Sequence, residues 1–232
     1  LSSLRFNADG TKLYILGLQQ DRIHEYSLSM PYDIASASYT DNLSVSSQSR
    51  YPFGFTFSAD GRTLFVVGTD NTFGAEARVS AWELGTPFDV STASFVSFLN
   101  LESFSEYPTD VKVSESGHEL FVLFSDSIQY SQTSSSFSTG SSGQEIDHIA
   151  SWNLSTANDI STAGTAELIG FADNLVRPEG FAFDKDATKL FFIDKSLDQI
   201  TEYQLDSPVE LRGDFVGSNA FHNLEQTGRL TV

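Results

Sequence analysis

Five aspartates are placed so that a repeated fold could gather their carboxylates around one channel. They are Asp70, Asp110, Asp126, Asp194 and Asp198. Ca²⁺ takes six to eight oxygen ligands from carboxylates, carbonyls and water, so these residues are candidate ligands for a calcium cofactor. The alternative is that the acidic loops are only solvated and contribute nothing beyond solubility.

A second group of residues has the chemistry of sugar recognition. A tyrosine ring offers an apolar face for stacking, and neighbouring amides and guanidinium groups donate hydrogen bonds. The candidate ligand-binding residues are Tyr51, Tyr107, Tyr130, Asn71, Arg50 and Arg177. The alternative is that the tyrosines pack between structural units, because a fold by itself does not fix a function.

Composition and motifs exclude several classes of function. The chain has 232 residues, 31 of them acidic and 13 basic, with a formal net charge of −18. A surface this acidic repels phosphate backbones and anionic lipids, so we expect no nucleic-acid partner and no membrane insertion. There is no cysteine, and no zinc-protease, phosphate-loop or serine-hydrolase motif occurs in the sequence. We therefore assign no catalytic residue from the sequence.

A repeated sequence motif, referred to here as a phrase, indicates the strands and turns that position these residues. Residues 4–17 recur with changes at 55–68, 111–124 and 181–194, each with an apolar run after a short polar turn. A second phrase of the Pro-aromatic-Asp type, as in 86–94, recurs between later segments, and its aspartate is expected to cap a tight turn. Repetition at this spacing indicates a repeat architecture.

Each copy divides into four strand-like stretches, which predicts an all-β β-propeller with four four-stranded blades. The predicted blades of this single domain are about 1–50, 51–106, 107–176 and 177–226. We expect the segment 227–232 to close the ring or to open a fifth blade. The blades could be part of a larger ring, and Leu1 aligns with the first residue of a repeat, so we expect a longer parent chain.

Propeller geometry places the candidate residues in two areas. Loops that join the second strand to the third, and each blade to the next, share one face, and most of the candidate residues fall there. Equivalent positions of the first strands form the channel wall. Gly54, Asp110 and Gly180 share one such position, while Arg5 and Lys112 share another. The two cations could bind an axial anion or pair with nearby carboxylates.

The phrases Asp9-Gly10-Thr11-Lys12-Leu13-Tyr14-Ile15 and Pro87-Phe88-Asp89-Val90-Ser91 resemble tandem propeller repeats of bacterial secreted and phage-associated proteins. Those repeats are distantly similar to the NHL, YWTD and YVTN families. The resemblance implies binding, adhesion or surface scaffolding, with a minority of calcium-dependent hydrolases.

We therefore expect a non-enzymatic extracellular, cell-surface or virion-surface propeller that recognises a glycan or a protein partner. The first alternative is a calcium-dependent hydrolase of lactones or phosphoesters at the channel mouth. It is disfavoured because, of the three equivalent channel positions, only Asp110 carries a carboxylate. The second alternative is a passive module of a filament or tail.

Overall fold

The structure is a computed structural model that describes residues 2–17, 20–70, 76–104, 107–125, 147–170, 175, 177–184, 188–205 and 225–231. For 169–170 and 225–231 only the backbone is described. Within this part of the chain the strands are β1 (Ser3–Phe6), β2 (Lys12–Gly17), β3 (Arg22–Leu28), β4 (Ala37–Ser44), β5 (Tyr51–Phe57), β6 (Thr63–Thr69), β7 (Arg78–Leu84), β8 (Ala93–Asn100), β9 (Tyr107–Val113), β10 (Glu119–Ser125), β11 (His148–Asn153), β12 (Glu167–Gly170), β13 (Pro178–Phe183), β14 (Lys189–Asp194), β15 (Gln199–Gln204) and β16 (Glu225–Thr231).

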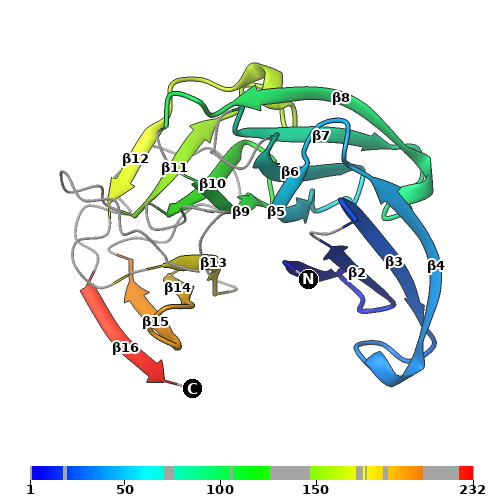
Figure 1. The fold of residues 1–232 in the computed structure, drawn as a ribbon, viewed down its shortest axis with the longest axis horizontal. Helices are drawn as coiled ribbons and strands as arrows, with labels where there is room; N and C mark the ends of the chain where they lie inside the picture. Colours follow the sequence, from blue (N-terminus) through cyan, green and yellow to red (C-terminus); the bar gives the residue numbers. More distant parts are fainter. Residues whose placement is uncertain are drawn as a thin grey trace, which may run out of the picture.

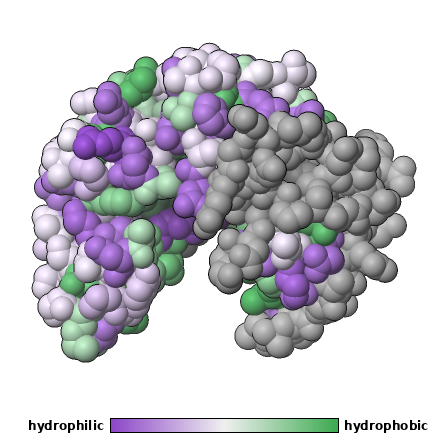
Figure 2. Space-filling model, turned by 180° about the vertical axis from the view of Figure 1, so that it is seen from behind, coloured by the Kyte–Doolittle hydropathy of each residue, from purple (hydrophilic) through white to green (hydrophobic). Residues whose placement is uncertain are grey.

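The strands form four antiparallel sheets of four strands each, which confirms the predicted propeller blades. Blade 1 contains β1–β4, blade 2 β5–β8, blade 3 β9–β12 and blade 4 β13–β16, and each sheet follows chain order. The blades stand side by side along an arc, with the first strand of each blade innermost (Figure 1). The arc is open between blade 4 and blade 1, where the space-filling view also shows two separate ends (Figure 2).

Local sequence explains the turns. Gly10 and Gly61 sit in the hairpins after the first strands with φ of 72° and 68°, a conformation that favours glycine. The Tyr32 and Phe88 rings cover these glycines, so that a Cβ atom there would lie 2.4 Å and 2.2 Å from the nearest ring carbon. The Pro-aromatic-Asp phrase thus folds back over its own blade's hairpin.

The same phrase forms a short 3₁₀ helix in the first three blades: η1 (Ile34–Ser36), η2 (Val90–Thr92) and η3 (Ile160–Thr162). Asp33, Asp89 and Asp159 accept hydrogen bonds from the amides two residues ahead, at 2.9–3.0 Å. The predicted aspartate-capped turn is confirmed.

The core consists of three apolar layers, one at each joint between consecutive blades. Alternate residues of a strand point to opposite faces of its sheet, so the second strands of blades 2 and 3 each contribute to two joints. Tyr14 and Leu16 of blade 1 meet Leu64 and Val66 of blade 2. The joint of blades 2 and 3 uses Phe65, Val67, Leu120 and Val122, and the joint of blades 3 and 4 uses Phe121, Leu123, Leu190 and Phe192.

The end of the chain differs from expectation. We expected 227–232 to close the ring or to begin a fifth blade, whereas β16 (Glu225–Thr231) pairs with β15 as the outer strand of blade 4. Phe215, near which we expected that outer strand, lies outside the described residues, as does the serine-rich stretch 131–144. None of the helices in the described part of the chain is long and apolar enough to span a membrane.

Candidate active site

A cavity of about 700 Å³ lies on the inner side of the arc. The inner strands of all four blades contribute to its wall, together with residues from β2, β14 and β15 at the open side. The wall is mainly apolar, and its charged residues are Arg5, Asp110 and Glu179. A cavity of this size accommodates a small organic ligand.

Two cations converge on Asp110, Arg5 from the cavity wall and Lys112 from a position next to the lining residues Asp110 and Phe181. The Arg5 guanidinium donates to Asp110 Oδ1 from 2.9 Å, and the Lys112 Nζ atom lies 2.5 Å from Asp110 Oδ2. Arg5 and Lys112 hold the same register position, since they pair with Tyr14 and Phe121 of their second strands. The predicted equivalence of the two cations is confirmed. Two roles were expected for them, binding an axial anion or pairing with nearby carboxylates, and the structure shows the pairing.

Glycines on the two neighbouring blades leave space for the Asp110 side chain. It is 5% exposed, and a Cβ atom on Gly54 would lie 2.8 Å from its Oδ1 atom. On the other side, the Phe181 amide donates to its Oδ2 atom from 3.4 Å, and a Cβ atom on Gly180 would lie 3.7 Å from the same oxygen. A larger side chain at Gly54 would displace the carboxylate, so this glycine belongs to the site.

The electrostatics of Lys112 are unusual for a lysine. Burial lowers the pKa of its amine to about 8; the Arg5 charge acts in the same direction and the Asp110 charge opposes both. The amine also lies 4.9 Å from the centre of the Phe181 ring. With a pKa of about 8, about a tenth of this amine is neutral at pH 7 and about half at pH 8, and the neutral form is able to accept a proton.

The site thus combines a potential base with a fixed positive charge. Arg5 has five N–H donors, and its bonds to Asp110 and to the Leu4 carbonyl (2.8 Å) leave donors for a ligand. Such an arrangement can activate a water molecule and stabilise a developing negative charge on an oxygen.

The four candidate calcium ligands that the structure describes are not gathered at one site. Asp70 faces Arg78 and Arg50, at 3.4 Å and 3.9 Å, and Asp110 is held by the two cations. Asp194 is buried and accepts from the amides of Arg177, Ser196 and Leu197, so it caps the turn after β14. Asp198 has a positive φ of 47° in that turn, and Asp126 lies outside the described residues.

Among the described residues no three His, Cys, Asp or Glu side chains gather in a way that could hold a metal ion. Because Asp126 lies outside the described residues, the calcium site expected from the sequence stays a prediction.

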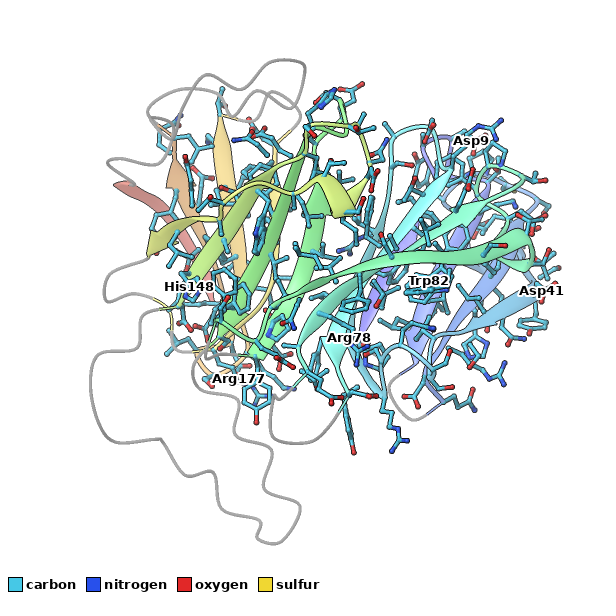
Figure 3. All side chains as sticks on the ribbon, turned by 90° about the horizontal axis from the view of Figure 1, so that it is seen from above. Asp9, Asp41, Arg78, Trp82, His148 and Arg177 are labelled. Atoms are coloured by element: carbon cyan, nitrogen blue, oxygen red, sulfur yellow. The ribbon has the colours of Figure 1, made fainter. Side chains whose placement is uncertain are left out.

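The candidate sugar-binding residues that the structure describes lie at or just before the starts of inner strands. Tyr51 and Tyr107 begin β5 and β9, Arg50 is exposed just before β5, and Arg177 pairs with Glu179 at 2.9 Å. Arg78, His148 and Arg177 lie at the same edge in Figure 3, and Asp9 lies at the opposite edge. Tyr130 and Asn71 lie outside the described residues.

Comparisons with known proteins give the fold but no family. No protein-family profile and no curated protein matches the chain. A Bacteroides uniformis structure, provisionally named a 6-phosphogluconolactonase, matches with a TM-score of 0.55 and 16% identity over 99% of this chain and 54% of that one. The periplasmic gluconolactonase of Pseudomonas aeruginosa matches with a TM-score of 0.51 and 16% identity over 99% and 53%.

Hydrazine synthase of Kuenenia stuttgartiensis matches with a TM-score of 0.56 and 12% identity over 98% of this chain and 61% of its own. The chain spans about half the length of the lactonases it matches. At these identities the likeness shows a β-propeller fold alone, and the particular repeat type expected from the sequence is not confirmed.

The comparisons contradict the prediction of a non-enzymatic adhesion propeller, and with it the prediction that the chain is not an enzyme. Structures that match almost the whole chain bear the names of lactonases. The prediction failed because it considered the channel positions only as metal ligands. Arg5 and Asp110 are 105 residues apart in the sequence, so only the folded ring shows that Asp110 is the carboxylate that joins the two cations.

Proposed function

We propose that this protein hydrolyses a lactone, a cyclic ester of a sugar acid, in the cavity lined by the inner strands. The observation that carries this proposal is the Arg5–Asp110–Lys112 cluster, in which an amine of lowered pKa lies beside a fixed guanidinium. Solved structures of the same fold that are named lactonases support the reaction class.

In the proposed reaction the neutral Lys112 amine takes a proton from a water molecule as the water oxygen adds to the lactone carbonyl carbon. Arg5 stabilises the negative charge that develops on the carbonyl oxygen. The tetrahedral intermediate then collapses with cleavage of the ring C–O bond, and the Lys112 ammonium returns its proton to the departing ring oxygen. The product is an open-chain hydroxy acid, and Asp110 keeps the Arg5 and Lys112 side chains in position throughout.

The residues that the structure describes do not gather a ligand set for Ca²⁺, so no step of this reaction involves it. Parallel assays with added Ca²⁺ and with a chelator test this point directly. Equal rates under both conditions are expected, and activity that is lost on chelation would overturn the metal-free scheme.

The experiment is a lactonase assay with glucono-δ-lactone and with its 6-phosphate, corrected for spontaneous hydrolysis. We expect Lys112→Met to lower kcat/KM at least about 100-fold, the usual contribution of a general base. Arg62→Met is the matched control, because Arg62 is an exposed cation in the hairpin after β5, away from the cavity, and full activity is expected.

The pH profile separates catalysis from structural damage. We expect kcat/KM to rise with pH through a midpoint near pH 8 and to level off above it, as the Lys112 amine loses its proton. Arg5→Met removes a charge that lowers this pKa, so the midpoint of the profile should move upward while the plateau falls. Rates equal to spontaneous hydrolysis for both lactones, or full activity of Lys112→Met, would overturn the proposal.

A further inference from the structure

Blades 2 and 3 each place a turn of the same construction against the preceding blade. Phe88 and Asn158 have positive φ angles of 57° and 60°, and their amides donate to the glycine carbonyl of their own blade's hairpin at 2.8 Å. Both turns continue into a 3₁₀ helix, η2 or η3, whose first residue is buried. The Phe88 carbonyl and the Val90 amide therefore have direct equivalents in the Asn158 carbonyl and the Ile160 amide.

Blade 1 holds the first of these turns with one ammonium and one carboxylate group. Lys12 Nζ donates to the Phe88 carbonyl from 2.7 Å, and Glu25 Oε2 accepts from the Val90 amide at 3.0 Å. The two side chains also pair with each other at 2.7 Å, and the Tyr14 hydroxyl donates to the same carbonyl. The turn thus presents one acceptor and one donor, placed to bind an ammonium and a carboxylate that lie side by side.

Blade 2 does not repeat this pair, and a notch of about 270 Å³ lies in its place. The register of β6 and β7 puts Thr63, Phe65 and Ala81 at the positions of the three side chains that hold the first turn. None of the three is charged. Thr63 and Ala81 border the notch from blade 2 and Asn158 borders it from blade 3, the next blade along the arc (Figure 1). The notch shares no lining residue with the cavity of the proposed reaction.

The wall of the notch contains buried oxygen atoms that lack a hydrogen-bond partner. Ser97 Oγ and Asn158 Oδ1 both belong to residues of this wall, and neither atom has a partner within the part of the chain that the structure describes. Buried polar atoms in proteins are nearly always hydrogen-bonded, so two such atoms at one cavity indicate a polar occupant. An ammonium group, with three N–H donors and no acceptor, fits a wall of oxygen atoms.

Charged side chains of both signs line the notch. Glu83 pairs with Thr63 across β6 and β7, so it lies beside the position that the Lys12 side chain occupies in blade 1. Arg62 directly precedes β6, and its guanidinium can bind a carboxylate through two parallel N–H bonds. Asp159 adds a second carboxylate. The lining residues therefore supply partners for an ammonium and for a carboxylate, with an excess of one negative charge.

We propose that the notch between blades 2 and 3 binds a free α-amino acid. The ligand's ammonium takes the place of the Lys12 group and donates to the Asn158 carbonyl and to the oxygen atoms of the wall. Its carboxylate takes the place of the Glu25 group and accepts from the Ile160 amide and from Arg62. The ligand thereby supplies in this joint the pair of charges that blade 1 carries on its own side chains. The negative excess among the lining residues favours an amino acid with a basic side chain.

The experiment is isothermal titration calorimetry with free L-lysine, glycine and L-glutamate, each at up to about 10 mM. We expect L-lysine to bind most tightly of the three. Methylamine and acetate, the two halves of glycine, should each bind at least about tenfold more weakly than glycine, because each lacks one of the two charged groups. Methylamine that binds as tightly as glycine, or no binding by any of the three amino acids, would overturn the proposal.

Two variants test the location. The double variant Thr63→Lys, Ala81→Glu places the blade 1 pair in the notch and should abolish L-lysine binding, while circular dichroism should show folded protein because the same pair fits the equivalent joint.

Arg62→Met, at an exposed position, should raise the Kd for L-lysine at least about tenfold. Arg22→Met is the matched control, because Arg22 is exposed on β3 of blade 1, and its Kd should be unchanged. Both single variants should keep full lactonase activity, so amino-acid binding and the proposed reaction can fail separately. L-Lysine binding that persists unchanged in Arg62→Met, or in the folded double variant, would show that the notch is not the site.

Discussion

The joint of blades 1 and 2 and the joint of blades 2 and 3 have the same geometry but different chemistry. In the first joint, Lys12, Tyr14 and Glu25 hold the Phe88–Val90 turn of blade 2 with three hydrogen bonds of 2.5–3.0 Å. In the second joint the equivalent positions are Thr63, Phe65 and Ala81, and the turn is held by apolar packing around Ile160.

The comparison shows that the repeat fixes the position of the turn. The interactions that hold the turn against the preceding blade differ from joint to joint. Phe65 and Tyr14 both have 0% exposure, so the ring is equally buried in the two joints. The Tyr14 hydroxyl adds a bond to the Phe88 carbonyl, which also accepts from Lys12. The stability of the apolar joint depends on how completely its side chains fill the space between the blades. The stability of the polar joint depends on whether every buried polar group has a hydrogen-bond partner.

The largest expected effect is a cavity in the apolar joint. Phe65→Ala should lower the free energy of unfolding by about 3–5 kcal/mol, because the neighbours of a fully buried ring cannot fill the space. Urea unfolding measures the change. Val96→Ala on β8 is the control, and because Val96 is 56% exposed its effect should stay within about 0.5 kcal/mol. A loss below about 1 kcal/mol for Phe65→Ala would show that the joint is not closely packed.

The next effect breaks the polar joint by removing its carboxylate. Glu25→Ala leaves the Lys12 amine and the Val90 amide without their partner, which should cost about 3 kcal/mol. Thermal and urea unfolding measure the loss, with Glu83→Ala as the control, since Glu83 is exposed on β7 of the next blade. If the double variant Lys12→Met, Glu25→Leu were no more stable than Glu25→Ala, the cost would not arise from unpaired buried charge.

The sequence predicts what is encoded locally and misses what the ring brings together. Asp9-Gly10 and the capping Asp89 were predicted correctly, because a hairpin and a capped turn need only adjacent residues. The Arg5–Asp110 pair joins positions 105 residues apart, so it depends on how the inner strands of blades 1 and 3 face each other.

Glu25 was missed for a related reason. It is a charged residue between His24 and Tyr26 in β3, a sequence that does not indicate burial, and in the fold it accepts from the Val90 amide of the next blade and is 2% exposed. The outer strand of blade 4 was placed near Phe215 rather than at β16, because outer strands carry the weakest alternation in this repeat.

The smallest effect concerns pH and again distinguishes the two joints. Burial and the nearby Glu25 charge raise the pKa of the Tyr14 hydroxyl far above its ordinary value of 10.0. Above pH 10 the unfolded chain releases this proton and the folded chain retains it. The stabilisation by Tyr14 is therefore fully present below pH 10 and is lost progressively as the pH rises beyond it.

Tyr14→Phe makes the polar joint resemble the apolar one at this position and should cost about 1 kcal/mol at neutral pH, the usual value of one hydrogen bond. Its stability should then fall less steeply between pH 10 and pH 11 than that of the unsubstituted protein, so the two curves converge. Tyr32→Phe is the matched control, because the Tyr32 hydroxyl is exposed and its bond to the Ala8 carbonyl lies within blade 1. Parallel curves for Tyr14→Phe and the unsubstituted protein would mean that the Tyr14 hydroxyl ionises as readily in the joint as in water, and that the joint is open to solvent.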